Sequence, residues 1–156
     1  MGGGSAGAQA PRCVTGQLKV TFRNVEGGLG HFGVAIVFTN AGDSCVIVGY
    51  PGVDGVSADG SHVVEAQRTP AGYLGGARGD PPLVTLAKGE VASALFEGFN
   101  GAVDSKGPCP PYNSLAVIAP DDTEEVAVPV PWEQPLCYPE IHPVVVGDTG
   151  GANVPG

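Results

Sequence analysis

The chain has 156 residues, which is the usual size of a single domain. Sixteen acidic residues against seven basic ones give a formal net charge of −9, and this excess of negative charge disfavours nucleic acids and anionic membrane surfaces as partners. No run approaches the roughly 20 apolar residues that a membrane-spanning helix needs. The many Gly and Pro residues fall mainly between short apolar runs, where they indicate turns.

The N-terminal segment 1–12 is predicted to be a flexible linker. Its first ten residues, MGGGSAGAQA, lack the apolar run of a signal peptide. We hypothesise that this linker once joined the domain to an export signal or a membrane anchor that is not part of the given sequence.

Two alternating segments follow the linker. In 17–24 and again in 32–39 every second residue is apolar, which is the pattern of a half-buried strand. The Gly-rich run 26–30 between them predicts a hairpin.

Shorter apolar runs predict further strands along the rest of the chain. They are 45–49, 62–67, 83–87, 91–98, 114–119, 125–130 and 141–146. Loops are expected at 50–60, 69–82 and 100–113. The segment 69–82 is the longest expected loop, and such loops are usually functional or mobile.

The sequence thus predicts about eight or nine short strands and no helix. This pattern favours an all-β fold, an immunoglobulin-like antiparallel β-sandwich over residues 13–146. The segment 147–156 is expected to be a flexible tail. Because Trp132 does not lie between paired cysteines as it does in antibody domains, the prediction concerns the architecture and not immunoglobulin membership.

Four cysteines allow three disulfide connectivities. Folding 17–39 about its turn brings Cys13 near Cys45, and folding the later hairpin about residues 121–122 brings Cys109 near Cys137. We therefore predict the disulfides Cys13–Cys45 and Cys109–Cys137. Disulfides persist in oxidising compartments, so the protein is expected to be extracytoplasmic, either secreted or anchored at the cell surface.

A zinc site is the competing interpretation of the cysteines. Zinc ligands usually come in close pairs such as C-x-x-C, whereas no two cysteines here are closer than 28 positions. The histidines, His31, His62 and His142, show no close pairing either. We expect no metal and no cofactor.

The segment 39–53, TNAGDSCVIVGYPGV, carries a family resemblance. A strand ends in T-N-x-G-x-x-C, a G-Y-P-G turn follows, and Asp59-Gly60 comes next. Weaker matches are Leu83–Leu86, Lys88-Gly89, Ala92–Phe96, Cys109, Leu115–Ile118 and Cys137. Over about residues 13–146 the chain resembles DUF4232, a family of secreted or lipoprotein domains of unknown function common in actinobacteria. The resemblance implies a β-sandwich outside the cytoplasm, often membrane-anchored, and implies no activity.

Three groups of residues are candidates for catalysis, cation binding or adhesion. His62 follows Ser61, but neighbours on a strand point to opposite faces, and the G-x-S-x-G elbow of many hydrolases is absent from the sequence. Carboxylates gather at Asp121, Asp122, Glu124 and Glu125, where a solvated turn is favoured over a Ca²⁺ site because the EF-hand spacing is missing. The run Arg78-Gly79-Asp80 matches an integrin-type tripeptide, which arises often by chance.

Five aromatic residues stand beside Pro or Gly outside the predicted strands: Tyr50, Tyr73, Tyr112, Trp132 and Tyr138. Tyr and Trp are enriched at binding interfaces, so these residues are the candidate binding patch if the loops gather. The alternative is that they pack against prolines and seal the loops.

We expect a non-enzymatic, extracytoplasmic binding or interaction module without catalytic residues, whose partner is an unknown protein or cell-envelope component. A structural envelope domain with no discrete ligand is the alternative, and a hydrolase is less favoured. A histidine within hydrogen-bond reach of a Ser or a carboxylate in a cleft would revive the enzyme hypothesis.

Overall fold

The alternating segments near the start of the chain form a long antiparallel hairpin, β2 (Leu18–Gly28) and β3 (His31–Asn40). Every second residue of β3, Val34, Ile36 and Phe38, is buried against the core. The hairpin predicted from the sequence is confirmed, and both strands are longer than predicted because pairing continues toward the Gly-rich turn.

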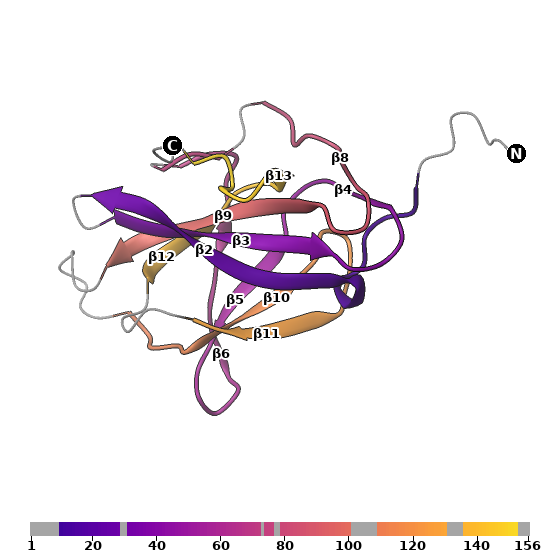
Figure 1. Ribbon diagram of the computed structural model, residues 1–156. Helices are drawn as coiled ribbons and strands as arrows, with labels where there is room; N and C mark the ends of the chain where they lie inside the picture. The colour runs from indigo at the N-terminus through magenta and orange to yellow at the C-terminus, as the bar shows by residue number, and fades with distance from the viewer. Residues whose placement is uncertain are drawn as a thin grey trace, which may run out of the picture.

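The computed structural model (Figure 1) describes residues 10–28, 31–72, 74–76, 79–100, 109–130 and 136–152. A 3₁₀ turn, η1 (Thr15–Gln17), precedes β2. The other strands are β4 (Cys45–Ile47), β5 (Gly52–Val56), β6 (His62–Glu65), β7 (Gln67–Arg68), β8 (Val84–Leu86), β9 (Val91–Asn100), β10 (Ser114–Ile118), β11 (Glu125–Pro129), β12 (Leu136–Ile141) and β13 (Val145–Val146).

Two sheets face each other across one core (Figure 1). The six-stranded sheet has the order β2-β3-β9-β12-β7, with β13 also paired to β9, and the four-stranded sheet has the order β11-β10-β5-β6. β4 and β8 form a separate two-stranded sheet. Buried residues from both large sheets make the core, among them Phe38, Phe96, Val53, Leu115 and Val117. The all-β prediction of an antiparallel sandwich is confirmed.

The run 62–68 belongs to both large sheets. Its first part, β6, pairs antiparallel with β5, and its second part, β7, pairs parallel with β12. The N–H of Ala66 donates to the Val53 carbonyl at 2.9 Å, and the N–H of Thr69 donates to the Ile141 carbonyl at 3.1 Å. Within the described residues β6 and β7 are therefore edge strands, each with a single partner.

The outer face of the six-stranded sheet is covered by chain. Val25, Ala35, Val37 and Leu95 form a second buried cluster there, and Leu74 and Ala152 pack on it. The latter two belong to separate segments, 69–76 and 147–152, which we call the outer cover.

The segment 147–156 was expected to be a flexible tail, but its first six residues pack on the six-stranded sheet. Residues 147–152 pack on β9: the Gly150 N–H donates to Ser93 Oγ at 2.8 Å, and Ser93 Oγ donates to the Gly147 carbonyl at 2.8 Å. A Cβ on Gly150 would lie 2.7 Å from the Leu95 nitrogen, so only glycine permits this approach. The sequence concealed the packing because small residues, not apolar ones, make it. Residues 153–156 lie outside the described part.

One loop prediction and one strand prediction were also wrong. The predicted loop 50–60 contains β5, whose glycines interrupt the apolar alternation that would have revealed it. The predicted strand 141–146 is the end of β12 and the short β13, separated by 142–144. No helix in the described residues is long and apolar enough to span a membrane.

Candidate functional site

The four cysteines form the two disulfides expected from the hairpin geometry. Cys13 is bonded to Cys45 at the start of β4, and Cys109 is bonded to Cys137 in β12. Cys13, Cys45 and Cys137 are almost completely buried, with 2% exposure or less. All four cysteines are therefore structural, and no free thiol is present.

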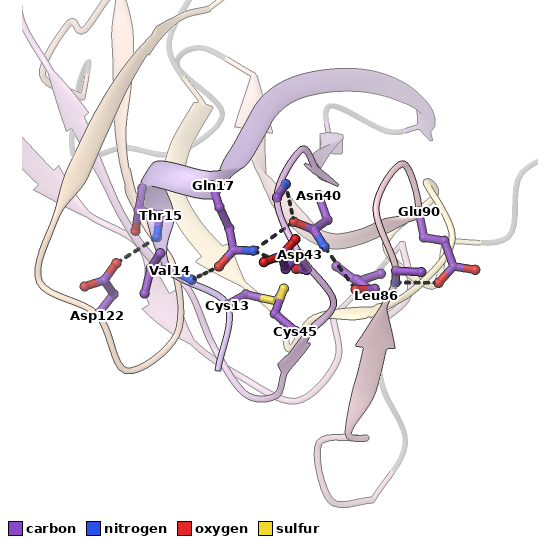
Figure 2. Close-up of a disulfide and its surroundings, with 12 residues drawn as sticks. Cys13, Val14, Thr15, Gln17, Asn40, Asp43, Cys45, Leu86, Glu90 and Asp122 are labelled. Atoms are coloured by element: carbon purple, nitrogen blue, oxygen red, sulfur yellow. Dashed lines mark hydrogen bonds between the residues drawn. A yellow bond between two sulfur atoms is a disulfide. The ribbon is translucent and has the colours of Figure 1, made fainter. Parts of the chain in front are cut away.

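Asn40, next to the first disulfide, organises the T-N-x-G-x-x-C turn (Figure 2). Its Nδ2 donates to the carbonyls of Asp43 at 2.9 Å and Leu86 at 3.0 Å. Its Oδ1 accepts from the N–H of Gly42 at 2.9 Å and from Gln17 Nε2 at 3.0 Å. Because this buried amide is fully hydrogen-bonded, the Asn40 side chain holds the turn and has no group left for a ligand.

A cleft of about 300 Å³ opens beside the G-Y-P-G turn. Half-buried Tyr50, Arg68 of β7, Ile118 at the end of β10, and Asp121 and Asp122 of the following turn line it. We call it the Tyr50 cleft. Arg68 is exposed and, within the described part of the chain, forms no ion pair.

The two aspartates of the Tyr50 cleft are already engaged. Asp121 lies 3.2 Å from the guanidinium of Arg12. Asp122 accepts from the N–H groups of Thr15 at 2.7 Å and Thr123 at 2.8 Å (Figure 2 shows the first). The hydrogen bond from the Thr15 N–H is the largest cause that lowers the pKa of Asp122 to about 2. Among the described residues, Arg68 is thus the charged group of the cleft that has no ion-pair partner.

A second recess, of about 280 Å³, lies by the other disulfide. Its lining includes Glu65, Gln67, Pro110, Tyr138 and Pro139. We call it the Tyr138 groove. Tyr138 is 47% exposed and has φ of 51°, a backbone conformation that residues other than glycine seldom adopt. It occupies the irregular stretch of β12 where the register with β9 shifts.

The two recesses lie on opposite sides of β7. Gln67 lines the Tyr138 groove and Arg68 lines the Tyr50 cleft, as successive side chains of a strand must point to opposite faces. An edge strand with a partly exposed tyrosine on each side is an arrangement suited to contact with another molecule.

Of the five aromatic residues in the predicted patch, the three that the structure describes lie apart. Tyr50 and Tyr138 lie in these recesses, whereas Tyr112 is 7% exposed and its hydroxyl donates to the Leu136 carbonyl at 2.9 Å. Burial raises the pKa of Tyr112 to about 12, although the hydrogen bond to Leu136 acts against it. Tyr112 therefore seals the sandwich. Tyr73 and Trp132 lie outside the described residues.

Sequence reasoning missed a buried ionisable pair beneath the outer cover. His142, just after β12, and Glu97 of β9 are both 0% exposed, and His142 Nε2 bonds Glu97 Oε2. His142 Nδ1 lies 2.8 Å from the Thr69 carbonyl oxygen, and Glu97 Oε1 accepts from the Leu74 N–H at 3.1 Å. The one available signal was a carboxylate inside the apolar run of β9.

The pair has a triad-like outline but not the connectivity of one. Thr69 Oγ1 lies 3.0 Å from His142 Nδ1, yet it donates to Glu140 Oε1 at 2.8 Å. Both imidazole nitrogens face oxygen acceptors, so a doubly protonated ring satisfies them and cannot take the threonine proton. Burial lowers the pKa of His142, but the bonds to Glu97 and the Thr69 carbonyl outweigh it, and the pKa is raised above 6.5.

His62 makes the corresponding contact in the open, on the four-stranded sheet. Its Nδ1 lies 2.7 Å from Asp54 Oδ2 and its Nε2 lies 3.7 Å from Glu125. The hydrogen bond with Asp54 is the largest cause of its raised pKa. Because the two ring nitrogens point to different carboxylates, these residues do not converge on one metal position, and the described residues contain no metal-holding group of three or more such side chains.

The remaining sequence candidates do not form a site. The acidic turn divides its carboxylates among Arg12, backbone amides and His62, as described above, so they do not gather around a cation position. Of the Arg78-Gly79-Asp80 run, Arg78 lies outside the described residues. Ser61 directly precedes His62, and its N–H is bonded to Asp59 Oδ1 at 3.0 Å.

A comparison with known proteins places this fold in a family. A family model described as a domain of unknown function, DUF4232, matches residues 13–150. No curated protein and no solved structure matches the chain. The match spans most of the chain and confirms the resemblance given by the T-N-x-G-x-x-C and G-Y-P-G motifs: the chain belongs to the DUF4232 family.

Proposed function

We propose that this protein is a non-enzymatic, extracytoplasmic binding domain of a secreted protein or a cell-envelope lipoprotein. It contacts its partner, a protein or another envelope component, through the surface on both sides of the edge strand β7. We call this surface the β6–β7 face and define it as Tyr50, Glu65, Gln67, Arg68 and Tyr138. The observation that carries this proposal is the pair of recesses, each with a partly exposed tyrosine, on opposite sides of the edge strand β7.

The chemistry of this face suits recognition. Tyrosine gives a large, rigid contact area and a polar tip, and it is enriched at binding hot spots. Each recess is at or below the lower limit of the several hundred Å³ that small-molecule sites usually occupy. Single side chains of a larger partner fit such spaces better than a whole small ligand does.

The histidine–carboxylate contacts support a function without catalysis. A general base must reach the proton that it abstracts from a substrate. His142 and Glu97 are completely buried, and both imidazole nitrogens of His142 are bonded to protein oxygens. His62 is accessible, but its two ring nitrogens face Asp54 and Glu125, and it lines neither of the two recesses.

The second candidate function is that of a structural envelope domain with no discrete ligand. The fully hydrogen-bonded Asn40 and the buried Tyr112 favour it, because both residues stabilise the fold and neither is available to a ligand. It does not account for the two recesses on either side of β7.

A capture experiment separates the two candidates. The folded domain and its Tyr50→Ser/Tyr138→Ser variant are used as bait for cell-envelope extract. The control is Leu83→Ser/Val146→Ser, which removes two side chains exposed by 52% and 75% and outside both recesses. We expect the tyrosine variant alone to lose the partner. Equal recovery of the partner by all three baits would contradict binding through the β6–β7 face, and recovery of no partner by any bait would favour the structural candidate.

The compartment needs its own test. Two disulfides are consistent with an oxidising compartment, and the proposed anchor would precede the linker at 1–12. Fractionation of cells that produce the natural protein should place it outside the cytoplasm. Recovery in the cytoplasm with reduced cysteines would contradict this part of the proposal.

A further inference from the structure

The open edge of β6 offers backbone hydrogen-bonding groups. The Ala66 N–H donates to Val53 in β5, and alternate residues of an antiparallel strand point their N–H and C=O groups to opposite sides. The N–H and C=O of Glu65 therefore point away from β5. Within the described residues no other strand pairs with β6 on that side.

The Tyr138 groove adjoins this edge and has a defined character. Val64 and Glu65 of β6 form one wall, and Tyr138 and Pro139 of β12 form another. Tyr138, whose backbone has a left-handed conformation, is 47% exposed. A strand laid along β6 would have an apolar contact surface directly beside its backbone.

The charge of the groove selects among possible partners. Glu65 is exposed, and the described residues that line the groove include no Lys or Arg. The whole chain carries a net charge of −9, so a cationic segment is attracted at long range as well as by Glu65.

We propose that the edge of β6 binds an extended peptide segment of the partner by strand addition, with an apolar side chain against Tyr138 and a Lys or Arg side chain against Glu65. This inference rests on the proposed function and specifies the partner's chemistry. In strand addition the main-chain hydrogen bonds supply affinity, while pockets for alternate side chains supply specificity.

The mode of binding also explains how the free protein avoids self-association through this edge. Edge strands are commonly protected by short length and by charge. β6 is four residues long and carries an exposed carboxylate, so a second acidic copy of the chain is repelled whereas a basic peptide is attracted.

Synthetic peptides test the inference without an identified partner. The probes are ten-residue peptides in which Lys alternates with Val, matched peptides in which Glu replaces Lys, and Lys peptides N-methylated on one or the other set of alternate residues. Titration calorimetry should show binding of the Lys peptide and at least tenfold weaker binding of the Glu peptide. One of the two N-methylated peptides should lose binding and the other should keep it.

Two substitutions at one position separate charge from backbone. Glu65→Gln keeps the outward N–H and loses the charge, whereas Glu65→Pro also removes that N–H without removing a donor to β5. We expect several-fold weaker peptide binding for Glu65→Gln and a further tenfold loss for Glu65→Pro. Glu124→Gln, an equal charge change in an exposed turn, should bind as the unmodified protein does.

The outcomes are distinct from those of the capture experiment. Equal binding of both N-methylated peptides, or equal affinity of Glu65→Gln and Glu65→Pro, would overturn strand addition. Failure of every peptide, or capture of a glycan through the tyrosines, would overturn the inference while the β6–β7 face remained the binding surface. If Glu65→Pro fails to fold, the N-methylated peptides still decide the question.

Discussion

Two regions of this molecule differ in whether other parts of the chain cover them. On the outer face of the six-stranded sheet, the cover at 69–76 and 147–152 buries an apolar cluster and the Glu97–His142 pair. At the β6–β7 face no described segment covers the sheets, and Arg68, Tyr138 and half-buried Tyr50 are accessible. The covered region is built for stability, and the open one is available for contact.

The two histidines make the same comparison. Each ring has a carboxylate beside it, but His142 is 0% exposed, and the side chain of His62 is 43% exposed. An ion pair in solvent contributes little to stability because water and salt screen it. Breaking a buried pair leaves a charge without its partner, which is costly. Burial, and not the identity of the residues, sets the expected effect of each substitution.

The largest effect is expected from Glu97→Gln. It leaves the His142 imidazolium buried without its counter-charge, and the free energy of unfolding should fall by about 3–5 kcal/mol. The matched change in the open contact, Asp54→Asn, should cost less than about 1 kcal/mol. Urea unfolding at mildly acidic pH measures both values, and similar losses for the two variants would remove the distinction between the regions.

A smaller effect is expected from Gly72→Ala in the cover. A Cβ at this position would lie 2.7 Å from His142 Nε2, so the cover must shift, at a cost of about 1–3 kcal/mol. Gly52→Ala in the Tyr50 cleft would place its Cβ 3.5 Å from Ile118, which is ordinary contact. Its unfolding free energy should change by less than about 0.5 kcal/mol. A tolerated Gly72→Ala would show that the cover is not tightly seated.

The pH dependence should differ between the regions as well. Because the pKa of His142 is raised above the unfolded value near 6.5, its stabilising contribution is complete below about pH 6.5 and is lost as the pH rises through the raised pKa. Unfolding midpoints measured from mildly acidic to alkaline pH should therefore decline over that window. Glu97→Gln should remove most of the decline and His62→Gln only a small part of it, because solvent screens the exposed contact; the reverse would place the main pH-sensitive contact on the open face.

The smallest effect on stability is expected where the effect on binding is largest. Tyr138→Ser removes a ring that is about half exposed, so the unfolding free energy should change by only about 0.5–1 kcal/mol. Tyr112→Phe, in contrast, removes a buried hydroxyl that is bonded to Leu136, and should cost about 1–2 kcal/mol. A large loss of stability in Tyr138→Ser would make Tyr138 a structural residue.

Regular alternation and cysteine spacing made much of the fold predictable. The β2–β3 hairpin has a period of two and a glycine turn, and the cysteine pairs flank hairpins, so local pattern was sufficient for both. β5 was missed because Gly52 and Gly55 interrupt its apolar run. The packed segment 147–152 was missed because glycines, through close approach, make its contacts.

The functional residues were harder to predict because their meaning depends on long-range pairing. Glu97 and His142 are 45 positions apart, and only the register of β12 against β9 brings them together. Tyr50 and Tyr138 were named from the sequence, but their position on either side of β7 requires the crossover of 62–68 between the sheets. Tyr112 looked like them in sequence and is buried, because local composition does not report which side of a loop faces the core.

Mapping the bound partner onto the domain tests the central claim most directly. Backbone amide NMR shifts of the labelled domain are recorded with and without the partner captured from cell-envelope extract. The account predicts that the largest shifts fall on residues 50, 62–68, 118–122 and 138–139, while those of 93–97 and 147–152 stay unchanged. Shifts concentrated on the outer cover, with none along β6 and β7, would contradict it.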